Sequence, residues 1–473
     1  MGSRSIRDVG KMTTSQIESR QVTSRLIRGI GASALGPIVT AAIQLGSVPL
    51  LIHAWGAAKY GDWLLISAIP SYLTFTDLGF GSSSGSDMTM RVAAGDWEGA
   101  LATFQSSWAL LCGLSLVVLA ALAALVWWAP WQPMLHLGAV TNRQAAYILL
   151  TLAAWILAVQ QWSILESGYR CDGNFALGNF CSTSQRLIEA VVATVLGVTT
   201  GSFLAVSLSY LGLRLLGLVC FRFLLKRKSP WLTLGFENAS VPAIRRMLKP
   251  SFGFIALPLG TAVSIQGFTL VIGVLLGPVA VAAFATARTL TRAGMLMINT
   301  IASGTWPELS SAFGAGNLPL ARNLHRHAYQ ASLILALGSA GLLWAFGPSF
   351  YDVWVRKSVA LDLACFHILL LVTIANSLWF VSATVQMSAN KHSRLAMVYL
   401  GATIASCGLG YGLVGRFGLT GSAMALLAIE IAMCAFVLRT TLKQMQDTPR
   451  EFFRAVFGSV YFVRPLLQSR FLR

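Results

Sequence analysis

Long apolar runs recur along this chain, and they limit the folds open to it more than any other feature. Each run has about 20 residues, enough for a helix to cross the ~30 Å hydrocarbon layer of a bilayer. The alternating segments of ~10 residues that a β-barrel needs are absent from the sequence. Charged residues make up 11% of the chain, whereas soluble proteins carry roughly 25%. Because only helices and closed barrels satisfy the backbone inside lipid, the sequence predicts an all-α polytopic membrane protein.

The apolar runs predict about twelve spans, and the even number places both termini on one side of the membrane. Most of the 35 Lys and Arg residues fall in the tails and in alternate loops, which is typical of cytoplasmic segments. Both termini are therefore expected in the cytoplasm, and the net charge of +18 requires no nucleic acid partner. The expected spans are 29–53, 61–83, 104–129, 145–167, 176–199, 202–225, 250–277, 280–304, 327–348, 362–386, 395–415 and 419–440.

The longest internal polar stretch, 226–249, divides the spans six and six, and the two halves are alike. Gly95-Asp96 follows the second span as Gly316-Asn317 follows the eighth. Pro37 and Pro258 are separated by the same interval as the two glycines, so they predict bends at matching places. Both halves begin on the same side, which predicts a parallel repeat of two six-helix lobes.

This plan divides the chain into five parts. We expect a cytoplasmic tail over 1–24, an N-lobe over 25–225, a cytoplasmic linker over 226–249, a C-lobe over 250–445 and a cytoplasmic amphipathic tail over 446–473. Within the last part, 452–471 mixes apolar and basic residues and predicts an interfacial amphipathic helix, with a disordered basic tail as the alternative. Two facing bundles suggest a transporter that rocks between two states; the alternative is a duplicated bundle with a structural role.

Arg288 and Arg292 are the strongest indication of a binding site. They lie four residues apart, on one face of the eighth span, and Asn299 continues that face. No acid lies within one helical turn of either arginine. A charge at this depth is costly, and paired guanidinium groups suit a phosphate, which arginine binds bidentately. Pairing with an acid on another helix, or snorkelling toward an interface, are the alternatives.

Three other charged residues in the spans lack a close opposite charge. Asp77 lies in a segment with a proline and several glycines that predicts a loosened helix. Its carboxylate is either a proton or cation site or a structural partner for Arg28 or Arg214. Arg214 extends a basic cavity in one interpretation, and Glu430 is a candidate coupling carboxylate.

Two spacings predict local ion pairs instead. Arg186 and Glu189 are three residues apart, and Glu166 and Arg170 are four apart, both compatible with contact on one helix. Glu189 is retained as a possible cavity acid for the same ion-coupling role.

No enzyme motif stands out in the sequence. There is no phosphate-binding loop for ATP, the six histidines are scattered, and the seven cysteines form no CxxC pair. We therefore predict no catalytic residues, no metal site and no bound cofactor, and a proton or sodium gradient as the expected source of energy. The first 24 residues have no signal-peptide pattern, so the first span is expected to act as an uncleaved signal anchor.

Two motifs carry a resemblance to a known family. The turn Trp55-Gly-Ala-Ala-Lys-Tyr-Gly-Asp-Trp and the run Ile69-Pro-Ser-Tyr-Leu-Thr-Phe-Thr-Asp-Leu-Gly-Phe-Gly precede Gly95-Asp96. Together they resemble the polysaccharide-transporter branch of the multidrug/oligosaccharidyl-lipid/polysaccharide (MOP) exporter superfamily, which includes O-antigen and capsule flippases. The two-lobe plan of that superfamily covers about residues 25–445.

The resemblance implies a flippase that moves undecaprenyl-pyrophosphate-linked glycans across the bacterial inner membrane, by alternating access through a central cationic cavity between the lobes. It implies a lipid bilayer and polysaccharide assembly proteins as partners. For the head group, the candidates are Arg288 and Arg292, with Arg28, Arg214, Arg186 and Asn299 as additions. A drug or cation antiporter of the same superfamily is the first alternative. A membrane glycan polymerase or ligase is the second, but it would carry a large extracytoplasmic loop that this sequence lacks.

Overall fold

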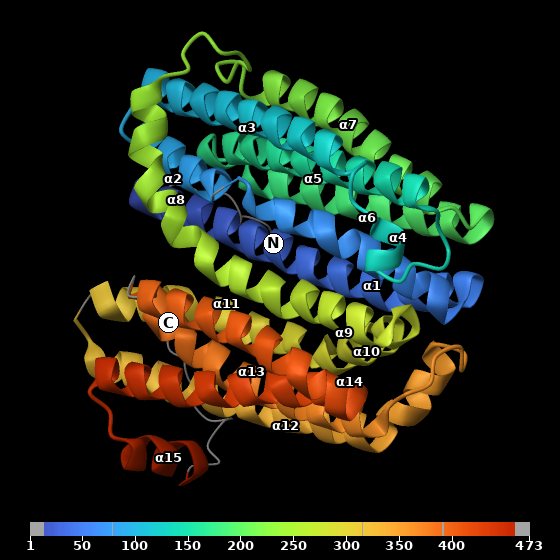
Figure 1. Ribbon diagram of the computed structural model, residues 1–473. Helices are drawn as coiled ribbons and strands as arrows, with labels where there is room; N and C mark the ends of the chain where they lie inside the picture. Colours follow the sequence, from blue (N-terminus) through green and yellow to red (C-terminus); the bar gives the residue numbers. More distant parts are fainter. Residues whose placement is uncertain (1–13, 78, 315, 390–391, 459–473) are drawn as a thin grey trace, which may run out of the picture.

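The computed structural model describes residues 14–77, 79–314, 316–389 and 392–458, and every regular element in these ranges is a helix (Figure 1). The helix begins at Thr14, so the tail expected over 1–24 is helical in its second part. The remainder of that tail lies outside the described residues. So does the end of the amphipathic stretch predicted over 452–471, since the description stops at Gly458.

The first half of the chain forms a bundle drawn in blue to green in Figure 1. Its elements are α1 (Thr14–Ser71), the 3-10 turn η1 (Tyr72–Phe75), α2 (Phe80–Ala93), α3 (Trp97–Leu125), α4 (Trp131–Met134), α5 (Asn142–Cys171), α6 (Phe175–Thr200) and α7 (Phe203–Lys228).

The second half forms a similar bundle, drawn in yellow-green to red. Its elements are α8 (Val241–Ala262), the π-helix η2 (Val263–Gly267), α9 (Phe268–Leu276), α10 (Pro278–Thr291), the 3-10 turn η3 (Arg292–Gly294), α11 (Met295–Gly314), α12 (Leu318–Trp354), α13 (Leu363–Ser388), α14 (Ser393–Met445) and α15 (Pro449–Gly458).

Eight of the described helices are long and apolar enough to cross a membrane by length and composition. Two of them, α1 and α14, each consist of two helical arms that meet where Gly56 and Gly418 leave helical dihedral angles. The other long segments are α6 and the pair α10–α11, which is interrupted by η3. The described residues therefore contain a polytopic helical membrane protein with long helices in both halves, as the sequence predicts.

The repeat is visible in the backbone as well as in the sequence. Three pairs of glycines adopt positive φ at matching turns, where a Cβ would be strained. The pairs are Gly56 with Gly277, Gly95 with Gly316, and Gly201 with Gly418. The first two pairs are separated by the interval that also separates Pro37 and Pro258. Both prolines lie inside continuous helices, so the matching interruptions fall at these turns and not at the prolines.

The two lobes meet closely at one end of the bundle. We call the end at which residues 229–240 lie the linker end, and the opposite end the far end. At the far end α1 packs on α10, and a Cβ at Gly61 would lie 1.8 Å from the carbonyl oxygen of Pro278. Trp354 at the end of α12 donates a hydrogen bond from Nε1 to the carbonyl oxygen of Leu45, at 2.8 Å. The absence of a side chain at Gly61 is what lets the two backbones touch.

The linker is folded onto the first lobe. Asp172 accepts hydrogen bonds from Ser229 and from Trp231 Nε1, and Gln105 bonds to the backbone of Thr233 and Asn238. These contacts attach residues 229–240 to the loops and helix starts of the N-terminal bundle. The basic stretch predicted as a linker is therefore an ordered part of that bundle's surface.

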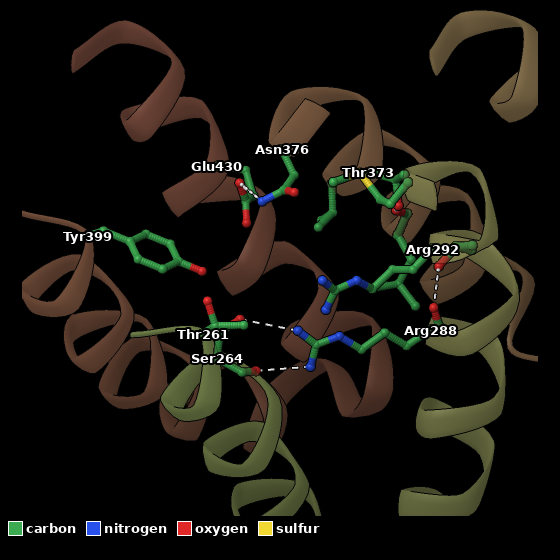
Figure 2. A pocket seen from close by; sticks show the side chains of 12 residues that line it. Thr261, Ser264, Arg288, Arg292, Thr373, Asn376, Tyr399 and Glu430 are labelled. Atoms are coloured by element: carbon green, nitrogen blue, oxygen red, sulfur yellow. Dashed lines mark hydrogen bonds between the residues drawn. The ribbon is translucent and has the colours of Figure 1, made fainter. Parts of the chain in front are cut away.

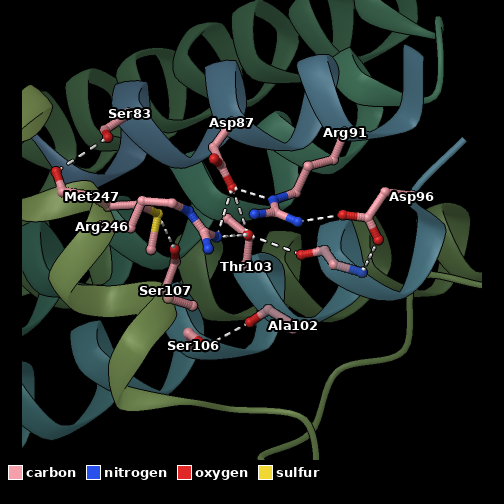
Figure 3. A network of polar contacts seen from close by, with 12 residues as sticks. Ser83, Asp87, Arg91, Asp96, Ala102, Thr103, Ser106, Ser107, Arg246 and Met247 are labelled. Carbon is pink, nitrogen blue, oxygen red and sulfur yellow. Dashed lines mark hydrogen bonds and ion pairs between the residues drawn. The ribbon is translucent and has the colours of Figure 1, made fainter. Parts of the chain in front are cut away.

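The start of α8 is tied to the first lobe by an ionic network at the linker end (Figure 3). Asp87 of α2 accepts from Arg246 Nη2 at 3.1 Å, from Arg91 Nε at 3.0 Å and from Thr103 Oγ1 at 2.7 Å. Asp96 forms an ion pair with the same arginine, through Arg91 Nη1. Further along, Gly260 of α8 lies against Tyr399 of α14. Helix α8 thus passes from the first lobe to the second.

Replacing Asp87 with asparagine is expected to loosen this attachment. Burial opposes the charged form of the carboxyl, but hydrogen bonds from Thr103, Arg246 and Arg91 outweigh it, so the pKa of Asp87 is lowered. A carboxyl with a lowered folded pKa contributes stability above its ordinary pKa of about 4 and loses it as the pH falls below that value. The protection of residues 229–249 from hydrogen exchange, relative to the intrinsic rate at each pH, should fall several-fold in D87N and should not change in wild type between pH 6 and 8.

The control for this prediction is Glu98→Gln. Glu98 is an exposed acid at the start of α3, at the same end of the bundle, so its substitution removes the same charge. Equal exchange in D87N and wild type would show that the Asp87 network does not hold the linker.

Candidate anion site in the second lobe

A small polar cavity lies inside the second lobe, between the α8–η2 junction, α10–η3, α13 and α14 (Figure 2). Its volume is about 30 Å³. It is lined by Thr261, Ser264, Arg288, Thr291, Arg292, Met295, Leu369, Val372, Thr373, Asn376, Tyr399 and Glu430. Both arginines predicted as head-group ligands are therefore on its wall.

Arg288 is fixed at the bottom of this cavity by the π-helix η2. Its Nη1 donates to the carbonyl oxygen of Ser264 at 2.9 Å, and its Nη2 donates to the Ser264 hydroxyl at 3.2 Å. A π-helix departs from the i→i−4 hydrogen-bond register, which leaves backbone groups to be satisfied by side chains. The same guanidinium lies near the ring of Phe284 on its own helix, at 5.9 Å. Arg288 thus has a structural role in addition to its charge.

Arg292 begins the 3-10 turn that ends α10, and its guanidinium points into the cavity (Figure 2). Among the described residues, no hydrogen bond or ion pair is found for this side chain. It lies one turn from Arg288, so two positive charges share one wall. An unpaired guanidinium in a lobe interior has its five donors available to an incoming acceptor.

Glu430 of α14 is buried on the opposite wall. It accepts hydrogen bonds from Asn376 Nδ2 at 3.0 Å and from Trp379 Nε1, both from α13. It forms no ion pair with the two arginines across the cavity in the described residues. With two guanidinium groups and one carboxylate, the ionised side chains of the cavity carry a net charge of about +1.

The cavity is too small for a large ligand in this state. A cavity needs about 10–15 Å³ of such space to hold one water, so this one suits one or two waters and not a diphosphate. Binding of a phosphorylated ligand there would therefore require the helices that line the cavity, such as α10 and α14, to move apart.

Three other head-group candidates are Arg186, Asn299 and Arg28. Arg186 is exposed, and its Nε donates to the carbonyl oxygen of Ser182. Asn299 is exposed and does not line the cavity. The side chain of Arg28 lies outside the described residues. The structure therefore brings together Arg288, Arg292 and Glu430 and separates them from Arg186 and Asn299.

Arg214 has no opposite charge close to it in the sequence, but the structure provides one from a neighbouring helix. Arg214 of α7 donates from Nη2 to Glu189 Oε2 at 2.7 Å, and both side chains are buried. Gln185 and Trp155 donate to the same carboxylate, and the Arg214 guanidinium lies 5.1 Å from the ring of Trp162. The charges of Arg214 and Glu189 thus neutralise each other inside the first lobe.

The predicted local ion pairs are wrong. Glu189 is taken by Arg214 on the neighbouring helix, so Arg186 has no carboxylate within reach in the described residues. Glu166 accepts from the Ser182 hydroxyl at 2.9 Å, and Arg170 lies over the ring of Phe175 instead. Contacts between helices have replaced contacts along one helix in both cases.

Asp77 lies where the second span is interrupted. Helix α1 ends at Ser71, η1 follows, and Gly79 has a φ of 75° before α2 begins. The carboxylate accepts from the Gly79 N–H at 3.0 Å, which closes a turn of the kind that aspartate favours. The loosened helix is confirmed, but the observed role of Asp77 is to shape this turn, and it is not bonded to Arg214.

The uncharged polar residues that line the cavity were not predicted from the sequence. Thr261, Ser264, Thr373, Asn376 and Tyr399 come from three segments far apart in the chain. Single hydroxyl and amide residues are common in membrane helices, so none of them stood out. The one available signal was Asn376, an amide in the middle of the apolar run predicted over 362–386.

Comparison with known proteins identifies the fold. No family model matches this chain, and no curated protein matches it. Among solved structures, the inward-facing conformation of a multidrug resistance MATE family transporter of the MOP superfamily matches with a TM-score of 0.73 at 14% identity, over 88% of this chain and 98% of that chain. An outward-facing conformation of a MATE family transporter gives 0.59 at 15% identity, over 89% and 95%.

A third match has a different pocket. It is a MOP superfamily transporter from Pyrococcus furiosus, described by a reverse polarity of its binding pocket that suggests a different function, with a TM-score of 0.59 at 14% identity, over 89% of this chain and 95% of that chain. The class defined by these matches is a polytopic helical membrane protein with two lobes. In particular, the chain has the fold of MATE transporters of the MOP superfamily.

Proposed function

We propose that this protein is an alternating-access flippase that moves undecaprenyl-pyrophosphate-linked oligosaccharides across the bacterial inner membrane for surface polysaccharide export. The observation that carries the proposal is the pair Arg288 and Arg292 on one wall of the second-lobe cavity, with Arg292 lacking a protein partner among the described residues. The proposal places both termini in the cytoplasm and takes the lipid-linked glycan as substrate.

The charge of the cavity favours an anionic substrate. Arginine binds phosphate oxygens bidentately, and its interactions strengthen where water is excluded. A cationic drug would instead meet two positive charges and one carboxylate that is already bonded to Asn376 and Trp379. The Pyrococcus transporter, with its reversed pocket polarity, is an example in which pocket charge differs within this fold.

The motifs that resemble polysaccharide transporters have structural roles here. Trp55 donates to the carbonyl oxygen of Gly197 at 2.7 Å, and Asp62 accepts from the backbone of Gly138 and Ala139. Gly79 supplies the positive φ beside Asp77. These residues stabilise the first lobe without touching the cavity. They support the resemblance of the first lobe to polysaccharide transporters. Recognition of a particular sugar would depend on other residues.

Glu430 is the candidate coupling group in this proposal. It is buried beside the arginines, whereas Glu189 is held by Arg214 and Asp77 closes a turn. A proton or sodium gradient would act by changing the charge that Glu430 presents to Arg288 and Arg292. The higher TM-score to the inward-facing relative supports assigning the described state to one open toward the cytoplasm.

The test is deletion of the gene in its host, followed by analysis of lipid-linked glycans in each leaflet of the inner membrane. We expect undecaprenyl-pyrophosphate-linked repeat units to accumulate on the cytoplasmic side, with loss of a surface polysaccharide. Re-expression of the wild-type chain should reverse both effects. Normal surface glycan together with new drug sensitivity would overturn the proposal in favour of a drug antiporter.

A further inference from the structure

Helix α15 is held firmly against the outside of the second lobe, beside the start of α12. Phe452 and Val456 are buried in a cluster with Tyr329 and Leu442. Before the helix begins, Asp447 receives a two-pronged hydrogen bond from Arg326, at 2.9 and 2.6 Å. The position of α15 is therefore fixed by both apolar and ionic contacts.

A basic groove runs between α15 and α12. It is open, has a volume of about 560 Å³, and is lined by Arg322 and Arg326 of α12 and by Glu451, Arg454, Ala455 and Gly458 of α15. Arg326 is neutralised by Asp447. Arg322 donates one hydrogen bond, from its Nε to the carbonyl oxygen of Met445 at 2.6 Å. In the described part of the chain, no partner is found for the terminal nitrogens of Arg322 or for Arg454.

The same helix exposes two aromatic rings outside the groove, and one of them, Phe457, lies three residues from Arg454 at the groove's edge. Phe453 and Phe457 are 39% and 68% exposed, and they stack on each other at 6.1 Å. They lie one helical turn apart, on a face distinct from the one that packs on α12. An exposed aromatic pair beside basic side chains is the pattern of a segment at the boundary between headgroups and acyl chains.

We propose that this groove binds the phosphate group of an anionic phospholipid, with Phe453 and Phe457 packed among its acyl chains. The terminal nitrogens of Arg322 and the guanidinium of Arg454 supply donors for the phosphate, and the rings supply the apolar contact that a free anion would not need. The groove is separate from the Arg288 and Arg292 cavity and goes beyond the proposed transport function. Its occupant is a bilayer lipid.

The test is lipid retention by the full-length protein. Wild type is reconstituted in nanodiscs of phosphatidylcholine with phosphatidylglycerol, extracted in mild detergent and examined by native mass spectrometry. We expect preferential retention of phosphatidylglycerol. The double variant R322Q/R454Q should retain about five- to twenty-five-fold less, because each basic residue near an anionic surface contributes roughly a five-fold factor. Arg326 is left intact, since it holds α15 in place.

The matched control is R143Q/R416Q, which removes two exposed charges at the far end. It should retain phosphatidylglycerol as wild type does. The variant F453S/F457S keeps the groove charges and should also lose retention. Wild-type retention in R322Q/R454Q or in F453S/F457S would overturn the proposal. Displacement of the lipid by millimolar inorganic phosphate would overturn it as well, because the groove would then recognise a free anion.

Discussion

Export should fall at least about thirty-fold when Arg288 and Arg292 are both replaced by alanine, while the protein remains in the membrane. The substitution changes the net charge of the cavity from about +1 to −1, with Glu430 left facing the substrate. Truncating a buried charged contact typically costs about 2–5 kcal/mol. Arg292→Ala alone should give most of this loss without unfolding, since Arg292 has no protein partner in the described residues. Arg288→Ala should also release the π-helix at Ser264.

The measurement is the transfer of lipid-linked repeat units to the outer leaflet in cells that express each variant in place of wild type. Double replacement by lysine keeps the charge but removes bidentate donation, so it should restore only part of the activity. Arg186→Ala is the matched control, because Arg186 lies in a long helix but is exposed outside the cavity. Normal export by both double variants, at normal membrane levels, would remove the anion site from the mechanism.

The second large effect is expected on stability, at the buried pair of the first lobe. Replacing Arg214 with methionine leaves Glu189 buried without its counter-ion, and replacing Glu189 with methionine does the same to Arg214. Removing one partner of a buried ion pair costs about 3–5 kcal/mol, whereas replacing both partners by apolar residues is often neutral. Each single variant should therefore be much less stable than the double variant R214M/E189M.

Thermal unfolding of the purified proteins in one detergent measures this difference. The double variant should unfold closer to wild type than either single variant, and it should retain export, because the pair does not line the cavity. Additive losses in the double variant would mean that the two charges act independently. Loss of export in a stable double variant would assign the pair a transport role.

The sequence predicted features that depend on local backbone chemistry. The interruption around Asp77 follows from a proline and glycines within one short segment, and the matching positions of Gly95 and Gly316 follow from the repeat. Arg288 and Arg292 lie together because their spacing is one helical turn. Each of these needs only neighbouring residues, which a single sequence contains.

Contacts between helices could not be predicted from neighbouring residues in the sequence. Glu189 is within reach of Arg186 on its own helix, yet it bonds to Arg214 on α7, because a buried carboxylate gains more from a partner in the dry interior. Glu430 and Asn376 meet across α13 and α14 in the same manner. The sequence shows which groups are costly to bury, but the packing of the bundle decides which group neutralises them.

The backbone contact between Gly61 and Pro278 holds the start of α10 in place at the far end of the molecule. The arm of α14 that carries Glu430 extends away from this end over residues 419–445, which at 1.5 Å per residue is about 40 Å. A tilt of this arm by about ten degrees would move its end by about 7 Å, and its middle by about half as much. Both walls of the cavity belong to the second lobe, so a small tilt of α14 against α10 within that lobe is enough to widen a space that now suits one or two waters.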